Sequence, residues 1–532
     1  MAKFEMAGYR GRERVEDKGR NQGMSDDNSR AEPIVIRETC RNPATPSRRG
    51  LLAAGAGLVG GAAAQLLAGE AMAAGGAATL DRLKRTERDP GHRLLLKGGI
   101  VLSLDPKVGD FENGDVLIEG KKILAVGRNL NAAALVVDAR GMIVMPGFVD
   151  THHHQYETIL RGILADGVLG SPDDGKKTYQ GVIQGIFTPV YQPEDAYISE
   201  LVASLNQLNA GVTTTVDTSQ VSHTPAHSDA CIAGLQESGR RAVYTYSPGV
   251  GPASQYPKDL LRLQSQYFSS ADQLLTLELN AAPNADNWAF ARQAGVPIIC
   301  HIVGDRIGNF EAIGKAGLMG PDNEYIHCTQ LNETHWKMIA DTGGKVSIAP
   351  AIEMQMRHGM PPFQTALDHG IQPSLSVDVE CNMTADMFSI MRAAFTLQRA
   401  LVNERSLAGE QNLPRLVNCR EVIEMATIGG ARAAHLDSKI GTLSPGKEAD
   451  IIMLAADSIN VFPLNNVPGT VVTLMDTSNV ETVFVAGKAV KWQGKLLGVD
   501  LNRLRRLIEK AHDGVLARAG HPPDLFDTCC AA

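Results

Sequence analysis

The chain of 532 residues is 44% hydrophobic, 21% charged and only 5% aromatic. This composition excludes intrinsic disorder, and no collagen or coiled-coil period is present. The 51 basic and 59 acidic residues give a net charge of -8, which argues against a nucleic-acid partner. The length allows three or four domains, or fewer if one is an α/β barrel. We therefore expect a soluble globular protein with the size of an enzyme.

Residues 1–75 have the features of an export signal. The pair Arg48-Arg49 precedes a run rich in Gly, Ala and Leu that extends to Leu67, and Ala71-Met72-Ala73 is typical of a cleavage site. A twin arginine before a weakly hydrophobic segment is the targeting signal of the Tat pathway. The run is too short and too rich in glycine for a bilayer span. We expect a periplasmic or secreted mature protein without a membrane span, or a cytoplasmic one if the start site is assigned too early.

Short alternating strands are predicted at both ends of the remaining chain, in residues 90–145 and 437–495. Turn sequences separate them, at Glu112–Gly114, Glu119–Lys121 and Ala486–Lys488. The expected strands are Leu94–Leu96, Ile100–Leu104, Asp115–Glu119, Lys122–Val126, Leu135–Asp138, Ala449–Leu454, Val471–Met475 and Val480–Val485. This pattern favours one small β-sandwich domain built from both ends of the mature chain, followed by a C-terminal helix and tail in residues 496–532.

In residues 146–436 the pattern changes to strands that alternate with helices. Most of these strands are continuous apolar runs, which is typical of strands buried on both faces. The eight expected strands are Ile143–Asp150, Val212–Asp217, Ala242–Ser247, Leu274–Leu279, Pro297–Val303, Tyr325–Thr329, Lys345–Ala349 and Ser374–Val379. The helices between them include Glu194–Ala210, Ala285–Ala294, Glu333–Asp341 and Thr384–Leu401. Eight such units predict an α/β fold with a (β/α)₈ TIM barrel.

Polar residues stand at the C-terminal ends of several of these strands, where barrel active sites lie. They are His152 and His154 after strand 1, His301 on strand 5, His327 on strand 6 and Asp378 on strand 8. Residues two apart in an extended segment project to the same side, so His152 and His154 can face one ion. Three imidazoles and one carboxylate suit zinc or another divalent metal. His327 remains beside such a metal as a proton-transfer group.

Each residue also has a structural interpretation when it is taken alone. A histidine in an apolar strand is more often a core residue than a ligand, and Asp378 could cap the next turn. Only the joint arrangement favours a metal site. The remaining histidines of this region are interpreted as structural because they lie on loops or helices: His223, His227, His335, His358, His369 and His435.

The segment Pro146–Gly162 resembles the signature of the amidohydrolase superfamily. The similarity is greatest to the branch of cytosine and guanine-type deaminases and triazine hydrolases, and it extends over nearly all of residues 93–495. Further matching segments are His301, His327–Thr329, Asp378 with Asp386–Phe388, Ala426–Arg432 and Ile440–Asp450.

The resemblance implies a metal-dependent TIM barrel with a flanking sandwich, a small-molecule substrate and a homo-oligomer. It assigns His152, His154, His301 and Asp378 as ligands of one divalent metal, usually Zn²⁺ and sometimes Fe²⁺. It also assigns His327 to orient or deprotonate the water that the metal activates. Our hypothesis for the mechanism is that Asp378 accepts the proton of this water and passes it to the departing nitrogen. Strand 4 offers no lysine that could be carboxylated, so a second metal is not expected.

One departure from the family pattern concerns the proton shuttle. In the deaminases a glutamate follows the strand-5 histidine by three residues, and here that position is Gly304. Asp305, Glu353 or Glu380 could substitute, or each could be an ordinary loop carboxylate. We expect a hydrolase of a non-peptide C–N bond in an amide, urea, carbamate or cyclic amide. The alternatives are a deaminase or dehalogenating hydrolase of an N-heterocycle, and an inactive binding protein on the same barrel.

Overall fold

A computed structural model describes residues 76–85, 89, 91–170, 178–304, 307–521 and 525. The chain divides into two units, Met1–Glu70 and Ala71–Ala532, and the described residues belong to the second. The predicted export signal, residues 1–75, lies outside the described residues, and so does Asp305. Within the described ranges, no helix combines the length and apolarity that crossing a bilayer requires.

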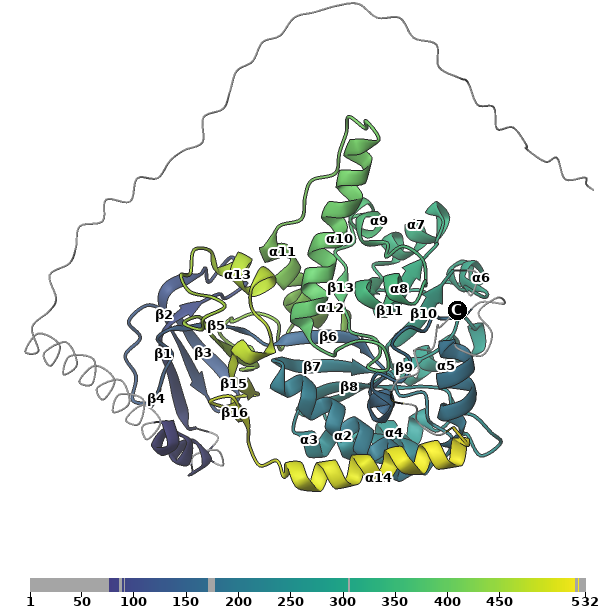
Figure 1. The fold of residues 1–532 in the computed structure, drawn as a ribbon, viewed down its shortest axis with the longest axis horizontal. Coiled ribbons are helices and arrows are strands. Elements are labelled where there is room, and N and C mark those ends of the chain that lie inside the picture. Colours follow the sequence, from purple (N-terminus) through teal and green to yellow (C-terminus); the bar gives the residue numbers. More distant parts are fainter. Residues whose placement is uncertain are drawn as a thin grey trace, which may run out of the picture. The chain divides into compact units, whose positions relative to one another are not determined.

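Eight parallel strands form a nearly closed barrel, as the alternating pattern predicted (Figure 1). Each strand pairs with the next one along the chain. The ends meet where the amide of Asp378 donates to the carbonyl of His152 (2.9 Å) and the amide of His154 donates to the carbonyl of Asp378 (2.8 Å). The strands are β6 (Phe148–His153), β7 (Val212–Asp217), β8 (Arg241–Tyr246), β9 (Leu275–Asn280), β10 (Ile298–Val303), β11 (Asn323–Thr329), β12 (Lys345–Ile348) and β13 (Ser374–Leu375).

Helices follow the barrel strands and cover their outer face, with α14 lying against α2 (Figure 1). The α-helices are α2 (Pro193–Asn209), α3 (Pro225–Ser238), α4 (Leu260–Tyr267), α5 (Ala285–Ala294), α6 (Phe310–Lys315), α7 (Glu333–Thr342), α8 (Pro350–Gln355), α9 (Phe363–Asp368), α10 (Met387–Leu407), α11 (Cys419–Glu424), α12 (Gly430–Ala433), α13 (Val467–Thr473) and α14 (Leu501–Ala519). Shorter helical segments are η1 (Gln155–Leu160), η2 (Gln180–Phe187), η3 (Thr188–Val190), η4 (Met425–Gly429) and η5 (Thr477–Asn479).

The predicted strand Val471–Met475 is wrong, because most of this segment belongs to α13. Its β-branched residues favour a strand when they are taken alone. The residues before them decide otherwise. The side chain of Asn466 accepts the amide of Gly469, and Pro468 occupies the first turn, where its missing N–H costs nothing.

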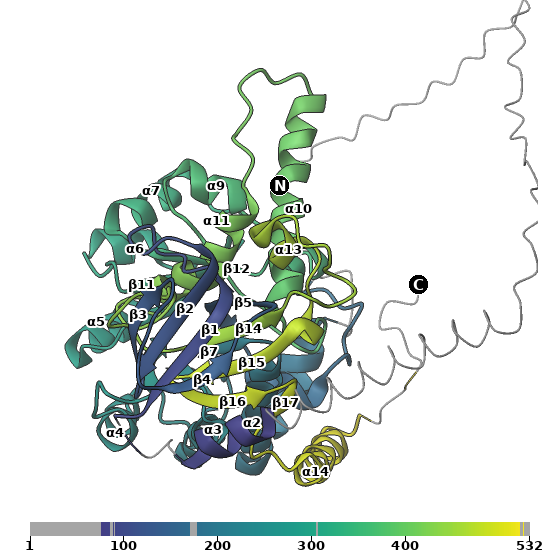
Figure 2. The same cartoon turned by 90° about the vertical axis from the view of Figure 1, so that its left-hand side faces the viewer.

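The strands from the two ends of the chain join in one mixed sheet, in the order β17-β16-β15-β14-β5-β1-β2-β3, with β4 paired to β1. Figure 2 looks onto this sheet and shows β1 beside β2 and β15 beside β16. The strands are β1 (Arg93–Val101), β2 (Phe111–Glu119), β3 (Lys122–Gly127), β4 (Leu135–Asp138), β5 (Met142–Pro146), β14 (Ile451–Ala455), β15 (Val480–Val485), β16 (Lys488–Trp492) and β17 (Lys495–Leu496). The expectation of a sheet built from both ends is confirmed.

Two local predictions need correction. The expected strand Ile143–Asp150 is two strands, since β5 pairs with β14 in the mixed sheet and β6 pairs with β7 in the barrel. Gly147 joins them, and a Cβ there would lie 2.2 Å from Oγ1 of Thr213, so only glycine fits without rearrangement. The strand β6, which carries the first histidines, is therefore a direct continuation of β5 in the mixed sheet.

The expected turn Glu112–Gly114 lies inside β2, where the ladder with β1 is irregular.

Candidate metal centre

Five residues from four barrel strands converge at the C-terminal end of the barrel, and we call them the cavity cluster: His152, His154, His301, His327 and Asp378. Nε2 of His152 lies 3.1 Å, and Nε2 of His154 3.5 Å, from Oδ1 of Asp378. Nε2 of His327 lies 3.7 Å from Oδ2 of the same carboxylate. Nε2 of His301 lies 3.2 Å from Nε2 of His152. The structure thus brings together all five residues predicted from the sequence, in groups spaced to hold a metal ion.

The hydrogen bonds behind two of these rings decide which nitrogen faces inward. Nδ1 of His154 donates to the carbonyl oxygen of Thr218 at 2.9 Å, so in the neutral ring Nε2 has no proton. Nδ1 of His152 lies 3.1 Å from Oγ1 of the same threonine. The unprotonated Nε2 of His154 therefore faces a carboxylate oxygen, lone pair to lone pair. Such an arrangement is favourable when a cation lies between the two atoms, which is the chemistry expected of a metal site.

Charge in the cavity cluster is divided between neutral rings and an ionised carboxylate. Burial lowers the pKa of His154 to about 3, and it lowers the pKa of His152 and holds that of His301 well below its usual range. For Asp378, burial raises the pKa, but the hydrogen bond with His152 and the charge of His327 bring it well below its usual range. Neutral imidazoles beside a carboxylate form the ligand set that Zn²⁺ prefers.

His327 has a different environment from the other rings. Its Nδ1 lies 3.0 Å from Oε1 of Glu353, which also accepts the amide of Ala349. Burial lowers the pKa of His327, but the bond to Glu353 and the charge of Asp378 outweigh it and raise the pKa. His327 is therefore the ring in the cluster best suited to carry a proton.

The backbone at two members of the cluster is strained. His327 and Asp378 have φ angles of 68° and 67°, in the left-handed region that costs about 1–2 kcal/mol per residue for side chains with a Cβ. Asp and His tolerate this region better than most residues with a Cβ, but less readily than Gly. Strain of this kind concentrates at active sites, where it aims a side chain that regular strand geometry would direct elsewhere.

A cavity of about 230 Å³ opens over the cluster. Its wall combines uncharged amides with apolar side chains, and no lysine, arginine or glutamate is among the described residues that line it. The amide side chains are Gln180, Gln184, Gln220 and Asn280, and the apolar ones include Leu169, Met356 and Val379. Sequence reasoning did not identify the amides, because two of them lie on η2, a π-helical segment that no periodicity indicates.

The predicted substitutes for the missing glutamate are all engaged elsewhere or outside the described residues. Gly304 has a φ of 54°, which favours glycine, and a Cβ there would lie 3.3 Å from Oε1 of Gln330. Glu353 contacts His327 rather than the cavity. Glu380 accepts hydrogen bonds from Thr158, Arg161 and Asn206. No glutamate in the described chain takes the vacated position.

His358 does line the cavity, against the structural interpretation that its loop position favoured. Its side chain is buried, and one ring nitrogen lies within 4.8 Å of ligand-type atoms of both His327 and Asp378. The only signal in the sequence was its place after a barrel strand, in the region where active-site loops lie.

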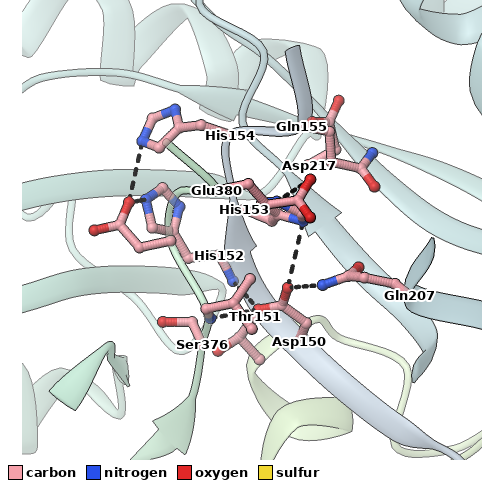
Figure 3. A network of polar contacts seen from close by, with 12 residues as sticks. Asp150, Thr151, His152, His153, His154, Gln155, Gln207, Asp217, Ser376 and Glu380 are labelled. Carbon is pink, nitrogen blue, oxygen red and sulfur yellow. Dashed lines mark hydrogen bonds and ion pairs between the residues drawn. The ribbon is translucent and has the colours of Figure 1, made fainter. Parts of the chain in front are cut away.

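A second set of buried polar residues lies beside β6, and we call it the polar network: Asp150, Gln155, Glu200, Gln207 and Arg240. Figure 3 shows Asp150, Gln155 and Gln207 of this network near His152 and His153. Arg240 donates to the side-chain oxygens of Gln207 and Gln155. Gln207 in turn donates to Asp150 (2.6 Å), and Gln155 to Glu200 (2.7 Å). The carboxylate of Asp150 accepts the backbone amides of His152 and Val377. The network therefore fixes the backbone beside two members of the cavity cluster.

The chain is similar to several characterised deaminases over most of its length. It is 27% identical to the 5'-deoxyadenosine deaminase of Methanosarcina mazei over 453 residues, which cover 80% of this chain and 99% of the relative. It is 24% identical to the 5-methylthioadenosine/S-adenosylhomocysteine deaminase of Caldicellulosiruptor saccharolyticus, covering 78% of this chain and 97% of the relative.

Solved structures share the fold. An adenosine deaminase from Xanthomonas campestris with bound zinc superposes with a TM-score of 0.69 at 22% identity, covering 80% of this chain and 98% of that one. The zinc complex of atrazine chlorohydrolase from Arthrobacter aurescens gives a TM-score of 0.68 at 20% identity, covering 79% and 100%.

The model of the amidohydrolase family matches residues 143–490, which is more than half of the chain. This range contains the barrel, the whole cavity cluster and the strands β14 and β15 of the mixed sheet. The chain therefore belongs to the amidohydrolase family, as a metal-dependent hydrolase that acts on carbon–nitrogen bonds.

Proposed function

We propose that this enzyme hydrolyses an exocyclic C–N bond of a neutral nitrogen heterocycle and releases ammonia or an amine. The observation that carries the proposal is the cavity wall, in which uncharged amides surround the cavity cluster and Asp378 is the only carboxylate among the described lining residues. Such a wall offers paired donors and acceptors to ring nitrogens and apolar contacts to ring faces, and it offers no countercharge to an ionic substrate.

The relatives favour the heterocyclic substrate over an open-chain amide, urea or carbamate. The curated relatives are named as deaminases of 5'-deoxyadenosine, 5-methylthioadenosine or S-adenosylhomocysteine, and the structural relatives as an adenosine deaminase and an atrazine chlorohydrolase. All of these compounds carry a leaving group on an aromatic nitrogen ring. An adenine-type ring is therefore the first substrate to test.

The proposed metal is a single Zn²⁺, with Fe²⁺ as the alternative, held by His152, His154, His301 and Asp378. The inward, unprotonated Nε2 of His154 and the ionised carboxylate of Asp378 fit such an ion. The zinc in the related adenosine deaminase structure supports the choice of metal. When bound, the ion would supply a Lewis acid that activates water and polarises the C=N bond.

Two residues of the cavity cluster then accept the proton of the water and stabilise the developing negative charge. The ionised carboxylate of Asp378 accepts the proton that the attacking water loses. His327, which Glu353 holds through Nδ1, presents Nε2 toward Asp378 and the cavity and stabilises the negative charge that develops during attack. The amides orient the substrate ring. The side chain of Gln184 donates to Gln220 (3.4 Å), and that of Asn280 donates to Ser247 (3.1 Å). These hydrogen bonds position both amides before a substrate binds.

The test is a panel of candidate substrates with the zinc-loaded protein. Adenosine, 5'-deoxyadenosine, 5'-methylthioadenosine and S-adenosylhomocysteine are compared with a diaminochlorotriazine and with a hydantoin and an anilide. Ammonia release, chloride release and the change in ultraviolet absorption report turnover. We expect ammonia release from at least one adenine compound and no turnover of the anilide. Chloride release alone, or hydrolysis confined to the hydantoin or the anilide, would overturn the proposal.

We also propose that residues 1–75 direct the protein through the Tat pathway, and that the mature protein is a homo-oligomer. The twin arginine and the cleavage-type sequence at Ala71–Ala73 support export. Cell fractionation of the wild type and of the double substitution Arg48→Lys, Arg49→Lys tests it, since the variant should stay in the cytoplasm. Light scattering of the mature protein checks the assembly, and a monomer would contradict it.

A further inference from the structure

His358 lies on the loop that follows α8, at the cavity and beside the cluster. Its side chain is buried and lines the cavity. Its ring packs edge-to-face on His327, with centroids 4.9 Å apart and an angle of 89° between planes. A ring nitrogen lies within 4.8 Å of both a nitrogen of His327 and an oxygen of Asp378. It is the cavity-lining histidine to which the mechanism above assigns no role.

The loop holds the backbone of His358 in place. The amide of His358 donates to the carbonyl of Glu353 at 3.0 Å, and its own carbonyl accepts Nε2 of Gln330 at 3.3 Å. The residues on either side have positive φ angles, 57° at Arg357 and 120° at Gly359. A Cβ at Gly359 would lie 3.0 Å from Nε2 of Gln330, so the turn is packed closely against the end of β11. A ring on such a turn is pre-positioned, as a reacting group needs to be.

The carboxylates near the cavity cannot serve the leaving group without breaking their present contacts. Glu353 is held by His327 and Ala349, and Glu380 by Arg161. Glu157 accepts the hydroxyl of Tyr179 at 2.6 Å and is not among the lining residues. Asp378 faces His152 and His154. A separate proton carrier for the leaving nitrogen is therefore required. Two cavity-lining histidines lie outside the proposed ligand set. Glu353 holds His327 against Asp378, where it stabilises the developing charge, so His358 is the histidine left for the leaving group.

We infer that His358 is the catalytic residue that protonates the leaving nitrogen in the reaction proposed above. Water adds its hydroxyl to the ring carbon and gives its proton to Asp378. The C–N bond then breaks with its electron pair on nitrogen. His358 delivers a proton to that nitrogen, which leaves as ammonia, and recovers a proton from Asp378. One water is consumed, one ammonia is formed, and both side chains end as they began.

The experiment compares two leaving groups on one ring, because chloride departs without a proton and an amino group does not. Adenosine and 6-chloropurine riboside are given to the zinc-loaded wild type, to His358→Gln and to His358→Ala. His369→Gln, which changes a half-buried histidine outside the cavity wall, is the matched control. Ammonia release, chloride release and zinc per chain are measured for each protein.

We expect kcat for ammonia release to fall about 100- to 1,000-fold in both His358 variants. We expect chloride release to change less than about fivefold, with zinc content and KM near those of the wild type. Equal losses with both leaving groups would overturn the inference and show a structural role. Loss of metal would overturn it and make His358 a ligand. A wild type that releases neither product here and no ammonia from the panel above overturns the proposed function and this inference together, whereas an active wild type with unaltered variants overturns this inference alone.

Discussion

The cavity cluster and the polar network meet at β6, and both are groups of polar side chains. The cavity cluster consists of histidines and one aspartate, whereas the polar network combines carboxyl and amide groups with one arginine. In the polar network, Arg240 lies among carboxylates, and burial raises the pKa of Asp150 to about 7, so protons and one arginine satisfy the group. In the cavity cluster, Asp378 is ionised and the rings of His154 and His301 are neutral. The polar network balances its charge internally, whereas the cavity cluster directs lone pairs at a common centre.

The difference teaches how a binding site can be distinguished from a structural network that is also built from buried polar groups. Burial does not separate them, because the polar network is buried throughout and only His301 of the cavity cluster is partly exposed. The direction of the hydrogen-bond donors does, because an amide side chain donates to each carboxylate of the polar network, whereas the Nδ1 donor of His154 points away from Asp378. The cavity cluster therefore directs lone pairs at a common centre, as a cation site requires, and the polar network does not.

Metal removal should produce the largest effect. Dialysis against a chelator should lower kcat by more than about a thousandfold, since the lost Lewis acid is worth several kcal/mol. Zinc should restore the activity, and the melting temperature should rise again with added zinc because the ion binds only the native state. Undiminished activity in metal-free protein would mean that the cavity cluster has a structural role, as the polar network does.

Asp378→Asn should abolish most turnover even in protein that is loaded with zinc. The amide keeps the shape of the carboxylate but accepts no proton from water, so we expect kcat to fall about 100- to 10,000-fold. The rate is measured per bound metal, by ammonia release and elemental analysis of the same sample. Asp386→Asn is a useful control, because Asp386 caps α10 through the amide of Ser389 and lies outside the cavity wall. Near-normal rates in Asp378→Asn would sink the assignment.

Arg240→Met tests the polar network. Removing the arginine leaves buried carboxyl and amide groups without their partner, so the free energy of unfolding should fall by about 3–5 kcal/mol. Denaturant unfolding measures the loss. Arg503→Met removes an exposed pair with Glu237 and should leave the stability close to that of the wild type. If the two variants were equally stable, the polar network would contribute nothing to folding.

Glu353→Gln tests the support of His327. The glutamine keeps the size of the side chain but loses the charge that raises the pKa of His327, so kcat should fall about 10- to 100-fold. Metal content should stay unchanged, because Glu353 contacts none of the proposed ligands. A steady-state assay with parallel metal analysis separates the two effects. A loss of metal instead of rate would move His327 into the ligand set.

Glu157→Gln should give the smallest change, visible only as a pH dependence. Burial raises the pKa of Glu157 to about 8, so the native state keeps a proton that the unfolded chain loses above about pH 4.5. Native stability therefore falls as pH rises from about 4.5 to 8. The variant lacks this titrating group, so its melting temperature relative to that of the wild type should rise between pH 5 and pH 8. Glu112→Gln, at an exposed position, should follow the wild type at every pH.

The barrel could be predicted because its strands are apolar, β-branched runs separated by helices, and β7 and β10 lie where those runs are. The sequence did not reveal that the segment Ile143–Asp150 divides at Gly147, because the residues on both sides are apolar. The two strands differ only in the strands with which they pair. The five residues of the cavity cluster were found because strand ends are visible in a sequence. His358 and Gln184 were missed, since a turn with two positive φ angles and a π-helical segment place them, and neither leaves a periodic pattern.

The continuity of β5 with β6 ties the first barrel strand to residues from the far end of the chain. β5 pairs with β1 and with β14, whose residues lie beyond position 450, and β6 carries His152 and ends just before His154. While the ribosome is still making the barrel helices, β5 has β1 beside it but not yet β14. Contacts of such long sequence separation slow folding. The sheet that continues into the first barrel strand is therefore complete only after the chain beyond position 450 has been made.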